Sequence, residues 1–248
     1  MSDVAIVTGG SRGIGRACSI KLAQQGYAVV VNYATNKAAA DAVVSAIITT
    51  GGKAVAVMGD VSKEADVLAI FATAEKLGTL KVLVNNAGIM DQVSRVEDMG
   101  AGRLERIVAV NITGSILCAR EAVKRMSTKR GGAGGAIVNL SSAASVLGGA
   151  GFSVDYAATK GAIDTLTIGL GREVAAEGIR VNAVRPGIID TEIHEAAGMP
   201  GRVEKMREQI PMQREGSAEE VADVIIYLCG PQSSYVTGTI VAVAGGRC

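Results

Sequence analysis

A glycine-rich turn close to the start of the chain constrains the fold more than any other stretch. Residues 8–15 read TGGSRGIG and directly follow the apolar, β-branched run 4–7. A helical pattern over 16–25 comes next and stops at Gly26, and a second apolar run covers 27–31. This order predicts a buried strand, a tight turn, a helix and a second strand.

Such a turn can bind a phosphate group. Glycines let the backbone turn tightly and approach a pyrophosphate, and the helix that follows offers free N–H groups at its positive end. Because the chain contains 32 glycines, the glycine spacing alone is weak support. A tight turn that binds no ligand is the plain alternative. The strand before the turn and the helix after it favour the nucleotide-binding interpretation.

Apolar runs and helical patterns continue to alternate along the chain. Further strands are expected at 54–58, 81–84, 136–140, 179–184 and 239–243. With the two strands above, they predict a Rossmann fold, that is, a doubly wound parallel sheet of seven strands with helices on both faces. Right-handed crossovers place the carboxyl ends of these strands at one edge. Ligands bind at that edge in open α/β sheets.

The helical patterns carry several local predictions. Ser62 is the expected N-cap of a helix over 63–76, and Ser217 begins an expected capping box for another helix. The pattern over 104–128 is apolar on more than one stripe, which suits a long helix packed on the sheet and on another subunit. Residues 188–215 are polar and interrupted by prolines, which predicts a substrate lid of short helices.

Composition excludes several classes of protein. Lysine and arginine total 25 against 24 for aspartate and glutamate, which argues against nucleic-acid or membrane binding through bulk charge. No apolar run reaches the roughly 20 residues that cross a bilayer. The chain shows neither a leader pattern nor a linker, so we expect a cytoplasmic protein with one domain over 1–248. Four scattered cysteines and a single histidine, His194, make a metal site unexpected.

The end of the second strand indicates which dinucleotide binds. Folds that prefer NAD place an acidic residue about 20 residues past the glycine turn, where it binds the ribose 2′-hydroxyl. No acid lies between Asn32 and Asn36. The side chains that can donate hydrogen bonds to a 2′-phosphate there are Asn32, Tyr33, Thr35 and Asn36. Arg12 in the turn can bind a 2′-phosphate, although it could also be a solvated loop charge. The sequence therefore predicts NADP(H).

Other polar residues are expected at the same edge. Asp60 follows the third strand and could accept a hydrogen bond from an adenine amino group or shape its own turn. Asn111 lies within an apolar helical pattern, so it is either a structural hydrogen-bonding residue or a site residue. Ser142 follows the fifth strand.

Tyr156 and Lys160 suggest proton transfer beside that edge. They are four residues apart, so they share one face of a helix. A tyrosine can give or take a proton, but its ordinary pKa near 10 is high, and a lysine ammonium beside it lowers that pKa. A serine hydroxyl can polarise a carbonyl. A surface tyrosine with a solvated lysine is the plain alternative. The nucleotide turn and the strand-end serines weigh against that alternative.

Six features follow one another along nearly the whole chain: TGGSRGIG at 8–15, NNAG at 85–88, Asn111, Ser142, YAATK at 156–160 and RPG at 185–187. In their types and their order they resemble the short-chain dehydrogenase/reductase family. Within the family the chain is most similar to 3-oxoacyl-carrier-protein reductases and glucose-dehydrogenase-like members. The resemblance implies a homotetramer.

The resemblance also implies a catalytic tetrad. Tyr156 would be the acid/base, and Lys160 would hold the nicotinamide ribose and lower the tyrosine pKa. Ser142 would orient the substrate, and Asn111 would hold a water that links Lys160 to solvent. Together with the glycine turn, the resemblance gives these cofactor-binding candidates: Gly9, Ser11, Arg12, Gly13, Ile14, Gly15, Asn32, Tyr33, Ala34, Thr35, Asp60, Val61, Asn86, Ala87, Gly88, Tyr156, Lys160, Pro186, Gly187, Ile189 and Thr191.

Three features depart from the family pattern. Ser142 lies fourteen residues before Tyr156, where many members have thirteen, so Ser141 and Ser145 stay open as the catalytic serine. Residues 244–246 read AGG, where members commonly have an aspartate before the glycines. Arg185 stands where many members have alanine, and its charge could enter the active-site mouth or reach an acid of the lid.

Two classes of function follow. The first is an NADPH-dependent reductase that transfers a hydride between the nicotinamide and a ketone or secondary alcohol, with 3-oxoacyl thioesters as one substrate class. A sugar dehydrogenase of the same family is an alternative. The second class is a protein that binds NADPH as a sensor or scaffold without catalysis.

Overall fold

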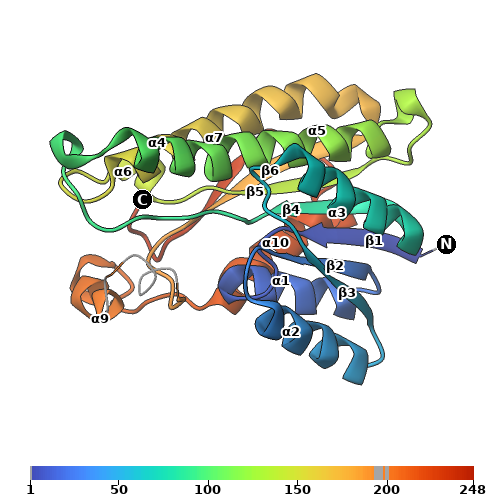
Figure 1. Cartoon of the computed structure of the whole chain (residues 1–248), viewed down its shortest axis with the longest axis horizontal. Coiled ribbons are helices and arrows are strands. Elements are labelled where there is room, and N and C mark those ends of the chain that lie inside the picture. Colours follow the sequence, from blue (N-terminus) through green and yellow to red (C-terminus); the bar gives the residue numbers. More distant parts are fainter. Residues whose placement is uncertain (1, 193–197, 199–200) are drawn as a thin grey trace.

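One parallel sheet organises the molecule. The computed structural model describes residues 2–192, 198 and 201–248. Within this part, seven strands pair in the order β3-β2-β1-β4-β5-β6-β7, and Figure 1 labels the first six. The strands are β1 (Ser2–Val7), β2 (Ala28–Tyr33), β3 (Lys53–Met58), β4 (Gly78–Asn85), β5 (Gly135–Leu140), β6 (Ile179–Pro186) and β7 (Ile240–Val243). The predicted doubly wound sheet of seven parallel strands is confirmed.

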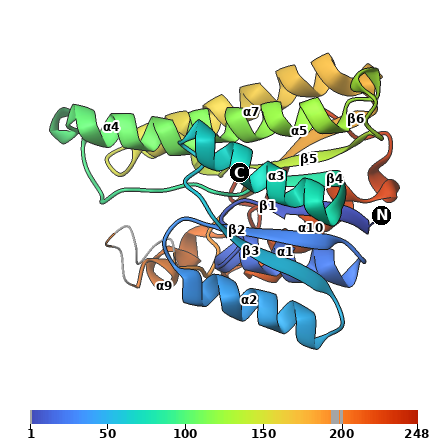
Figure 2. The same cartoon turned by 45° about the vertical axis from the view of Figure 1, so that its right-hand side comes forward.

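Helices cover both faces of the sheet (Figures 1 and 2). The α-helices of the described residues are α1 (Gly13–Gln24), α2 (Lys37–Thr49), α3 (Glu64–Leu77), α4 (Ala101–Val108), α5 (Ser115–Met126), α6 (Ala144–Leu147), α7 (Val154–Val174), α9 (Arg202–Met206) and α10 (Ala218–Cys229). Short 3-10 turns cover Val96–Asp98, Thr128–Arg130, Ala175–Glu177, Arg207–Gln209 and Pro231–Ser233. None of the described helices has the length and apolar character that a bilayer crossing requires.

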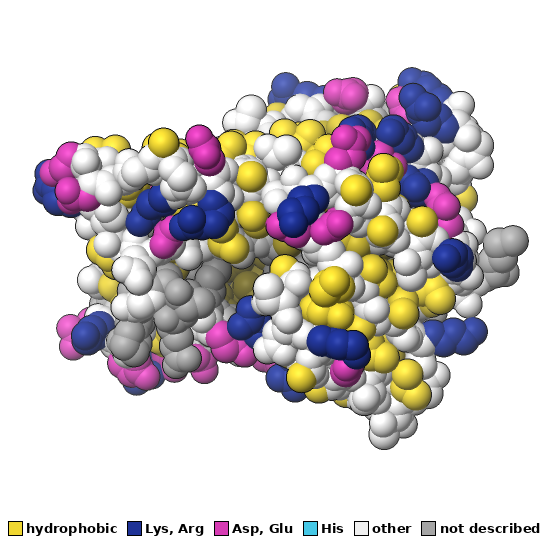
Figure 3. Space-filling model, viewed as in Figure 1, with side chains coloured by type: hydrophobic (Ala, Val, Ile, Leu, Met, Phe, Trp, Pro, Cys, Tyr) yellow, Lys and Arg dark blue, Asp and Glu magenta, His cyan; other side chains and the backbone are white. Residues whose placement is uncertain are grey.

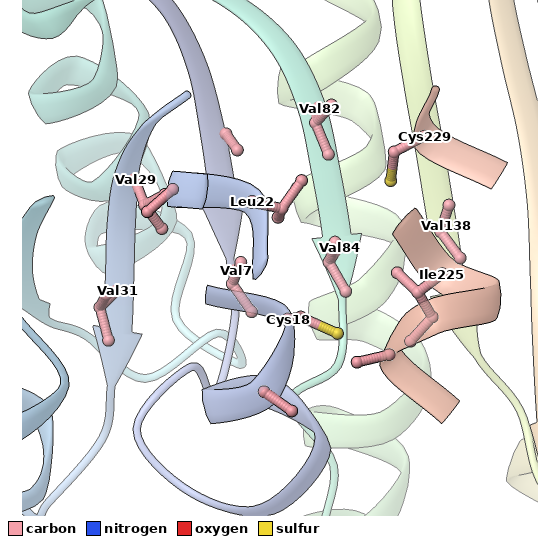
Figure 4. Close-up of a cluster of buried hydrophobic side chains, with 14 of the residues drawn as sticks. Val7, Cys18, Leu22, Val29, Val31, Val82, Val84, Val138, Ile225 and Cys229 are labelled. Carbon is pink, nitrogen blue, oxygen red and sulfur yellow. The ribbon is translucent and has the colours of Figure 1, made fainter. Parts of the chain in front are cut away.

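Two apolar layers hold the helices to the sheet. Side chains alternate along each strand, so Ala5 and Val7 of β1 face one layer while Val4 and Ile6 face the other. The first layer packs α1, α2 and α10 on the sheet, with Leu22 and Ile225 fully buried among strand valines (Figure 4). The second layer packs α3, α5 and the end of α7 on the opposite face. Burial on both faces explains why the strands are continuous apolar runs.

The helix expected over 104–128 is interrupted. The chain is helical from α4 to α5, but residues Ala109–Gly114 between them form a π-helix. Asn111 lies in this segment, and the Ser115 hydroxyl donates to its carbonyl at 2.9 Å. A π-turn widens the helix locally and commonly marks a functional site. The apolar periodicity of the sequence does not reveal this widening, because it follows side chains and not backbone hydrogen bonds.

Other local predictions meet different outcomes. The Ser217 capping box is confirmed, since its hydroxyl accepts from the Glu220 N–H at 3.1 Å and the Glu220 carboxylate accepts in return. Ser62 is not the N-cap of α3, because its hydroxyl instead donates to Asp60 at 2.7 Å and Lys63 takes the capping position. The charge of Arg185 was expected in the active-site mouth or beside an acid of the lid. Its guanidinium instead pairs with Asp164 of α7 at 2.7 Å.

The segment after β6 leaves the sheet and returns to it. Ile189 and Gly216 form an isolated parallel bridge, which ties its two ends together. The described part holds α9 and one 3-10 turn, as expected of short helices. His194 lies outside the described residues. On the face shown in Figure 3, Lys and Arg side chains are mixed with Asp and Glu side chains, in keeping with the near-zero net charge.

Candidate active site

A large cavity runs along the carboxyl edge of the sheet. Its volume is about 960 Å³, and its lining extends from Asp60, after β3, to Arg247, after β7. Of the predicted site residues, Gly15 and Asn111 do not line it. The others all do: Gly9, Ser11, Arg12, Gly13, Ile14, Asn32, Tyr33, Ala34, Thr35, Asp60, Val61, Asn86, Ala87, Gly88, Ser142, Tyr156, Lys160, Pro186, Gly187, Ile189 and Thr191.

The glycine turn forms a cradle that has no room for side chains. Gly9 and Gly13 have φ angles of +60° and +47°, which favour glycine. A Cβ atom on Gly15 would lie 2.2 Å from the Gly9 carbonyl oxygen, so Gly15 acts behind the cavity wall. No side chain caps the start of α1, where Arg12 takes the N-cap position. The first N–H groups of the helix are therefore available to an anion, and the cradle fits a pyrophosphate.

The NNAG segment is locked onto this turn. The Thr8 hydroxyl accepts from the N–H groups of Asn86 and Ala87, each at 3.0 Å. The Asn86 amide donates back to the carbonyls of Thr8 (2.9 Å) and Gly9 (3.0 Å). Asn85 points the other way and donates to Asn139 of β5 at 3.0 Å. The two asparagines therefore hold the ends of β1, β4 and β5 in a fixed arrangement.

The adenosine end of the cavity differs in one respect from the expectation. Both hydrogens of the Asn32 amide are used inside the protein, on the carbonyls of Val57 (3.3 Å) and Gly59 (3.0 Å). Its oxygen accepts from the Gly9 N–H at 3.2 Å. The prediction that this side chain donates to a 2′-phosphate is therefore wrong, because Asn32 ties the turns after β1 and β3 together. Arg12 and Thr35 lie exposed at this end.

Asp60 shapes its own turn and also lies at the cavity. One carboxylate oxygen accepts from the Ser62 N–H at 3.0 Å and from the Ser62 hydroxyl, so it shapes the turn after β3. The same residue lines the cavity.

The three serines after β5 occupy different environments. Ser142 lines the cavity, and its Oγ accepts from the Ala144 N–H at 3.1 Å, which leaves its own hydrogen to donate. Ser141 also lines the cavity but donates to the Lys160 carbonyl at 3.3 Å. The Ser145 hydroxyl is buried with no partner among the described residues, and Ser145 does not line the cavity. This geometry favours Ser142 among the three.

Lys160 and Tyr156 lie together at the middle of the cavity. The Lys160 Nζ atom is 5.6 Å from the centre of the Tyr156 ring and donates to the Leu140 carbonyl at 2.6 Å. Lys160 is only 5% exposed. Burial lowers the pKa of its ammonium from 10.5 to about 8, while the Asp164 carboxylate partly opposes that shift by raising the pKa. A cation is therefore held close to the phenol ring in a poorly solvated place.

Asn111 lies behind the cavity wall. Its side chain accepts from the Ile89 N–H at 2.8 Å and donates to the Ile89 carbonyl at 2.9 Å and to Thr159 at 3.1 Å. A Cβ atom on Gly88 would lie 3.4 Å from the Asn111 oxygen and 3.5 Å from the Lys160 Nζ atom. The Asn111 oxygen and the Lys160 Nζ atom thus converge on the same side of Gly88.

Two features of the site were not predicted from the sequence. Arg103 of α4 forms a bidentate pair with the buried Asp155 at 2.7 and 3.2 Å, which fixes the start of α7 next to Tyr156. The pair joins residues 52 positions apart, so no local spacing announces it. The second feature is the far end of the cavity, where the lining includes residues that no motif singles out: Met90, Leu147, Phe152, Met206 and Arg247.

Comparisons with known proteins agree over nearly the full length. A family model described as "Enoyl-(Acyl carrier protein) reductase" matches residues 9–247. The chain is 55% identical over 245 residues to "Uncharacterized oxidoreductase YgfF" of Escherichia coli K12, covering 98% of this chain and 99% of that protein. It is 39% identical over 252 residues to a "3-oxoacyl-[acyl-carrier-protein] reductase" of Synechocystis, covering 99% and 96%.

A solved structure agrees as well. It is "Short-chain dehydrogenase/reductase from Serratia marcescens BCRC 10948", with a TM-score of 0.91 and 34% sequence identity. The match covers 99% of this chain and 97% of the Serratia chain.

Proposed function

Since the chain belongs to the short-chain dehydrogenase/reductase family of oxidoreductases, we propose that it interconverts a ketone and a secondary alcohol with NADP(H). One observation carries this proposal. The buried Lys160 ammonium lies 5.6 Å from the Tyr156 ring, in the same cavity as Ser142 and the glycine turn. A proton donor, the cation that tunes it and a nucleotide cradle therefore share one space.

Tyr156 supplies the proton in the direction of reduction. The phenol gives its proton to the carbonyl oxygen, and in the reverse direction the phenolate takes it back. The ordinary tyrosine pKa near 10 would make the phenolate scarce at neutral pH, and the nearby Lys160 ammonium favours it. Ser142 donates to the same oxygen and polarises the carbonyl.

Asn111 and Lys160 hold a water through which Tyr156 regains the proton that it gives to the substrate. Both side chains approach the same side of Gly88, which supports a water held between the Asn111 segment and the ammonium. Asn111 belongs to the π-helix at Ala109–Gly114, and such turns commonly mark functional sites. Asn111 acts through Lys160, so it is a positioning residue.

The cavity supports a dinucleotide, which supplies the hydride when it is bound. The glycine cradle suits its pyrophosphate, and Asp60 suits the adenine. Lys160 would bind the nicotinamide ribose, and Ile189 and Thr191 would bind the carboxamide. The start of the proposed lid segment lies on the glycine turn, since a Cβ atom on Gly13 would lie 3.2 Å from the Thr191 side chain.

Cofactor choice depends on Arg12. The turn after β2 carries no acid that would repel a 2′-phosphate, and Arg12 lies exposed beside it. We expect Arg12→Ala to weaken NADPH binding by about tenfold to a hundredfold, the range for a charge-assisted hydrogen bond, and to leave NADH binding unchanged. Fluorescence titration with both cofactors measures this. Wild-type protein that binds NADH better than NADPH would contradict the NADP(H) proposal.

The reaction itself is tested by a kinetic screen. Ketones, 3-oxoacyl thioesters and sugars are offered with NADPH and NADH, and cofactor oxidation or reduction is followed by absorbance. We expect NADPH oxidation with at least one ketone or oxoacyl compound. Tight NADPH binding with no turnover of any compound would instead support a sensor or scaffold.

The protein is proposed to assemble as a homotetramer. Leu104 and Val108 of α4 and Ile116 of α5 are between 41% and 46% exposed, and they form an apolar stripe along consecutive helices. Exposed apolar stripes of this kind commonly mark subunit contacts. Sedimentation equilibrium is expected to give four times the chain mass, and Ile116→Asp is expected to lower the assembly state. A wild-type monomer would contradict the proposal.

A further inference from the structure

The C-terminal turn brings an unpaired arginine to the cavity. Arg247 lines the cavity and is neither fully buried nor fully exposed. In the part of the chain that the structure describes, its guanidinium has no ion pair and no hydrogen-bonding partner. A partly buried cation without an internal partner is available to a ligand.

The backbone around Arg247 is fixed. Its N–H donates to the Ala244 carbonyl at 3.1 Å and closes a turn, in which Gly245 and Gly246 have φ angles of +59° and +86°. The Met212 N–H donates to the Gly245 carbonyl at 3.1 Å. Because these bonds and the two glycines set the path of the chain, Arg247 is held at the cavity by the fold.

The sheet order places Arg247 at the substrate end. Asp60 follows β3 at one edge of the sheet, and Arg247 follows β7 at the opposite edge. Ser142 follows β5, two strands from β7. Strands lie about 4.8 Å apart, so the ends of β5 and β7 are separated by about 10 Å. Arg247 therefore lies on the side of the sheet away from the adenosine end, in a turn that follows a strand about 10 Å from the strand before Ser142.

The charges near Arg247 leave it as the site for an anion. Arg106 also lines the cavity, but it pairs with Asp91. Glu192 lies at the glycine turn, where a Cβ atom on Gly13 would be 3.6 Å from its carboxylate. The side chains of the substrate end are otherwise mostly apolar and include Leu147, Phe152 and Met206.

We propose that Arg247 binds a carboxylate of the substrate, so that the substrate is an oxo acid with a short apolar chain between the carbonyl and the carboxylate. The inference rests on the proposed function and adds the substrate class to it. A guanidinium binds a carboxylate through two parallel hydrogen bonds. The separation of about 10 Å between the strand ends suits a chain of a few carbons.

Matched acids and esters test this proposal. The substrates are 4-oxopentanoate, 5-oxohexanoate and 6-oxoheptanoate, each with its methyl ester, and the enzymes are wild type, Arg247→Gln, Arg247→Lys and the surface control Arg172→Gln. We expect Arg247→Gln to raise KM at least tenfold for the preferred acid, with kcat and the ester KM unchanged. Arg247→Lys should recover part of the loss, and Arg172→Gln should match wild type.

A second pair separates a carboxylate from a phosphate. Acetoacetyl-CoA carries phosphates, and acetoacetyl-N-acetylcysteamine does not. A KM increase confined to acetoacetyl-CoA would overturn the carboxylate assignment, as would equal effects, or none, on acids and esters. Turnover of esters without a preference for acids overturns this inference alone, whereas NADPH oxidation with no compound overturns the proposed function as well.

Discussion

Tyr156→Phe is expected to lower kcat for ketone reduction by about 10³-fold, within the range that a positioned acid contributes. Phenylalanine keeps the ring that lies 5.6 Å from the Lys160 ammonium but lacks the hydroxyl that gives the proton. NADPH affinity should stay within about twofold of wild type, because the binding contacts of the cradle are untouched. Stopped-flow absorbance gives kcat, and fluorescence titration gives the affinity.

Tyr227→Phe is the matched control. Tyr227 lies half-exposed on α10 and does not line the cavity, so the same chemical change there should leave kcat unaltered. If Tyr156→Phe kept a rate close to that of wild type on every active substrate, the acid/base role would be wrong.

Lys160→Met is expected to make the protein inactive and more stable. Methionine has nearly the length of the lysine stem but no charge, so the phenol of Tyr156 loses the cation that favours its ionised form. We expect kcat to fall by at least about 10²-fold. The melting temperature should rise, because burying the wild-type ammonium costs free energy of folding.

The pH dependence of stability tests this cost. Burial lowers the pKa of Lys160 to about 8 from an unfolded value of 10.5. The cost of the buried charge is thus fully present below pH 8 and disappears as the pH rises from about 8 to 10.5. Since one pKa unit corresponds to about 1.4 kcal/mol, Lys160→Met should gain up to about 3 kcal/mol in free energy of unfolding at pH 7.

Urea unfolding of the cofactor-free proteins at pH 7 and pH 10 measures the difference between variant and wild type. Taking that difference removes the other titrating groups that the two proteins share. The gain should shrink at pH 10. A variant that is less stable than wild type at pH 7 would show that the ammonium stabilises the site instead.

Most of the fold could be predicted because its signals are local. Each strand is a short apolar run, and each helix that covers the sheet carries its own periodicity. The exceptions arise from hydrogen bonds whose partners the sequence pattern does not identify. Ser62 looked like a cap, but Asp60, two residues earlier, competes for its hydroxyl. Asn111, in the π-helix, bonds the backbone of Ile89 on a separate segment.

The cofactor half of the site was predictable in a way that the substrate half was not. The glycine turn, the asparagines after β4 and the Tyr156–Lys160 spacing each place several residues in one short stretch. Arg247 reaches the cavity only because β7 lies beside β6, and Arg185 finds Asp164 across the interface between β6 and α7. Such pairs are set by the order of strands, and a chain read in sequence order does not show which ends will meet.

Hydride transfer is the most direct test of the central claim. Wild-type protein is incubated with NADPH that carries deuterium on the transferring face of C4, together with each ketone and oxo acid, and the products are analysed by mass spectrometry. We expect an alcohol with one deuterium on the carbinol carbon, and no such product from Tyr156→Phe. Protein that binds NADPH tightly but yields no deuterated alcohol from any compound would contradict the claim that this chain is a carbonyl reductase.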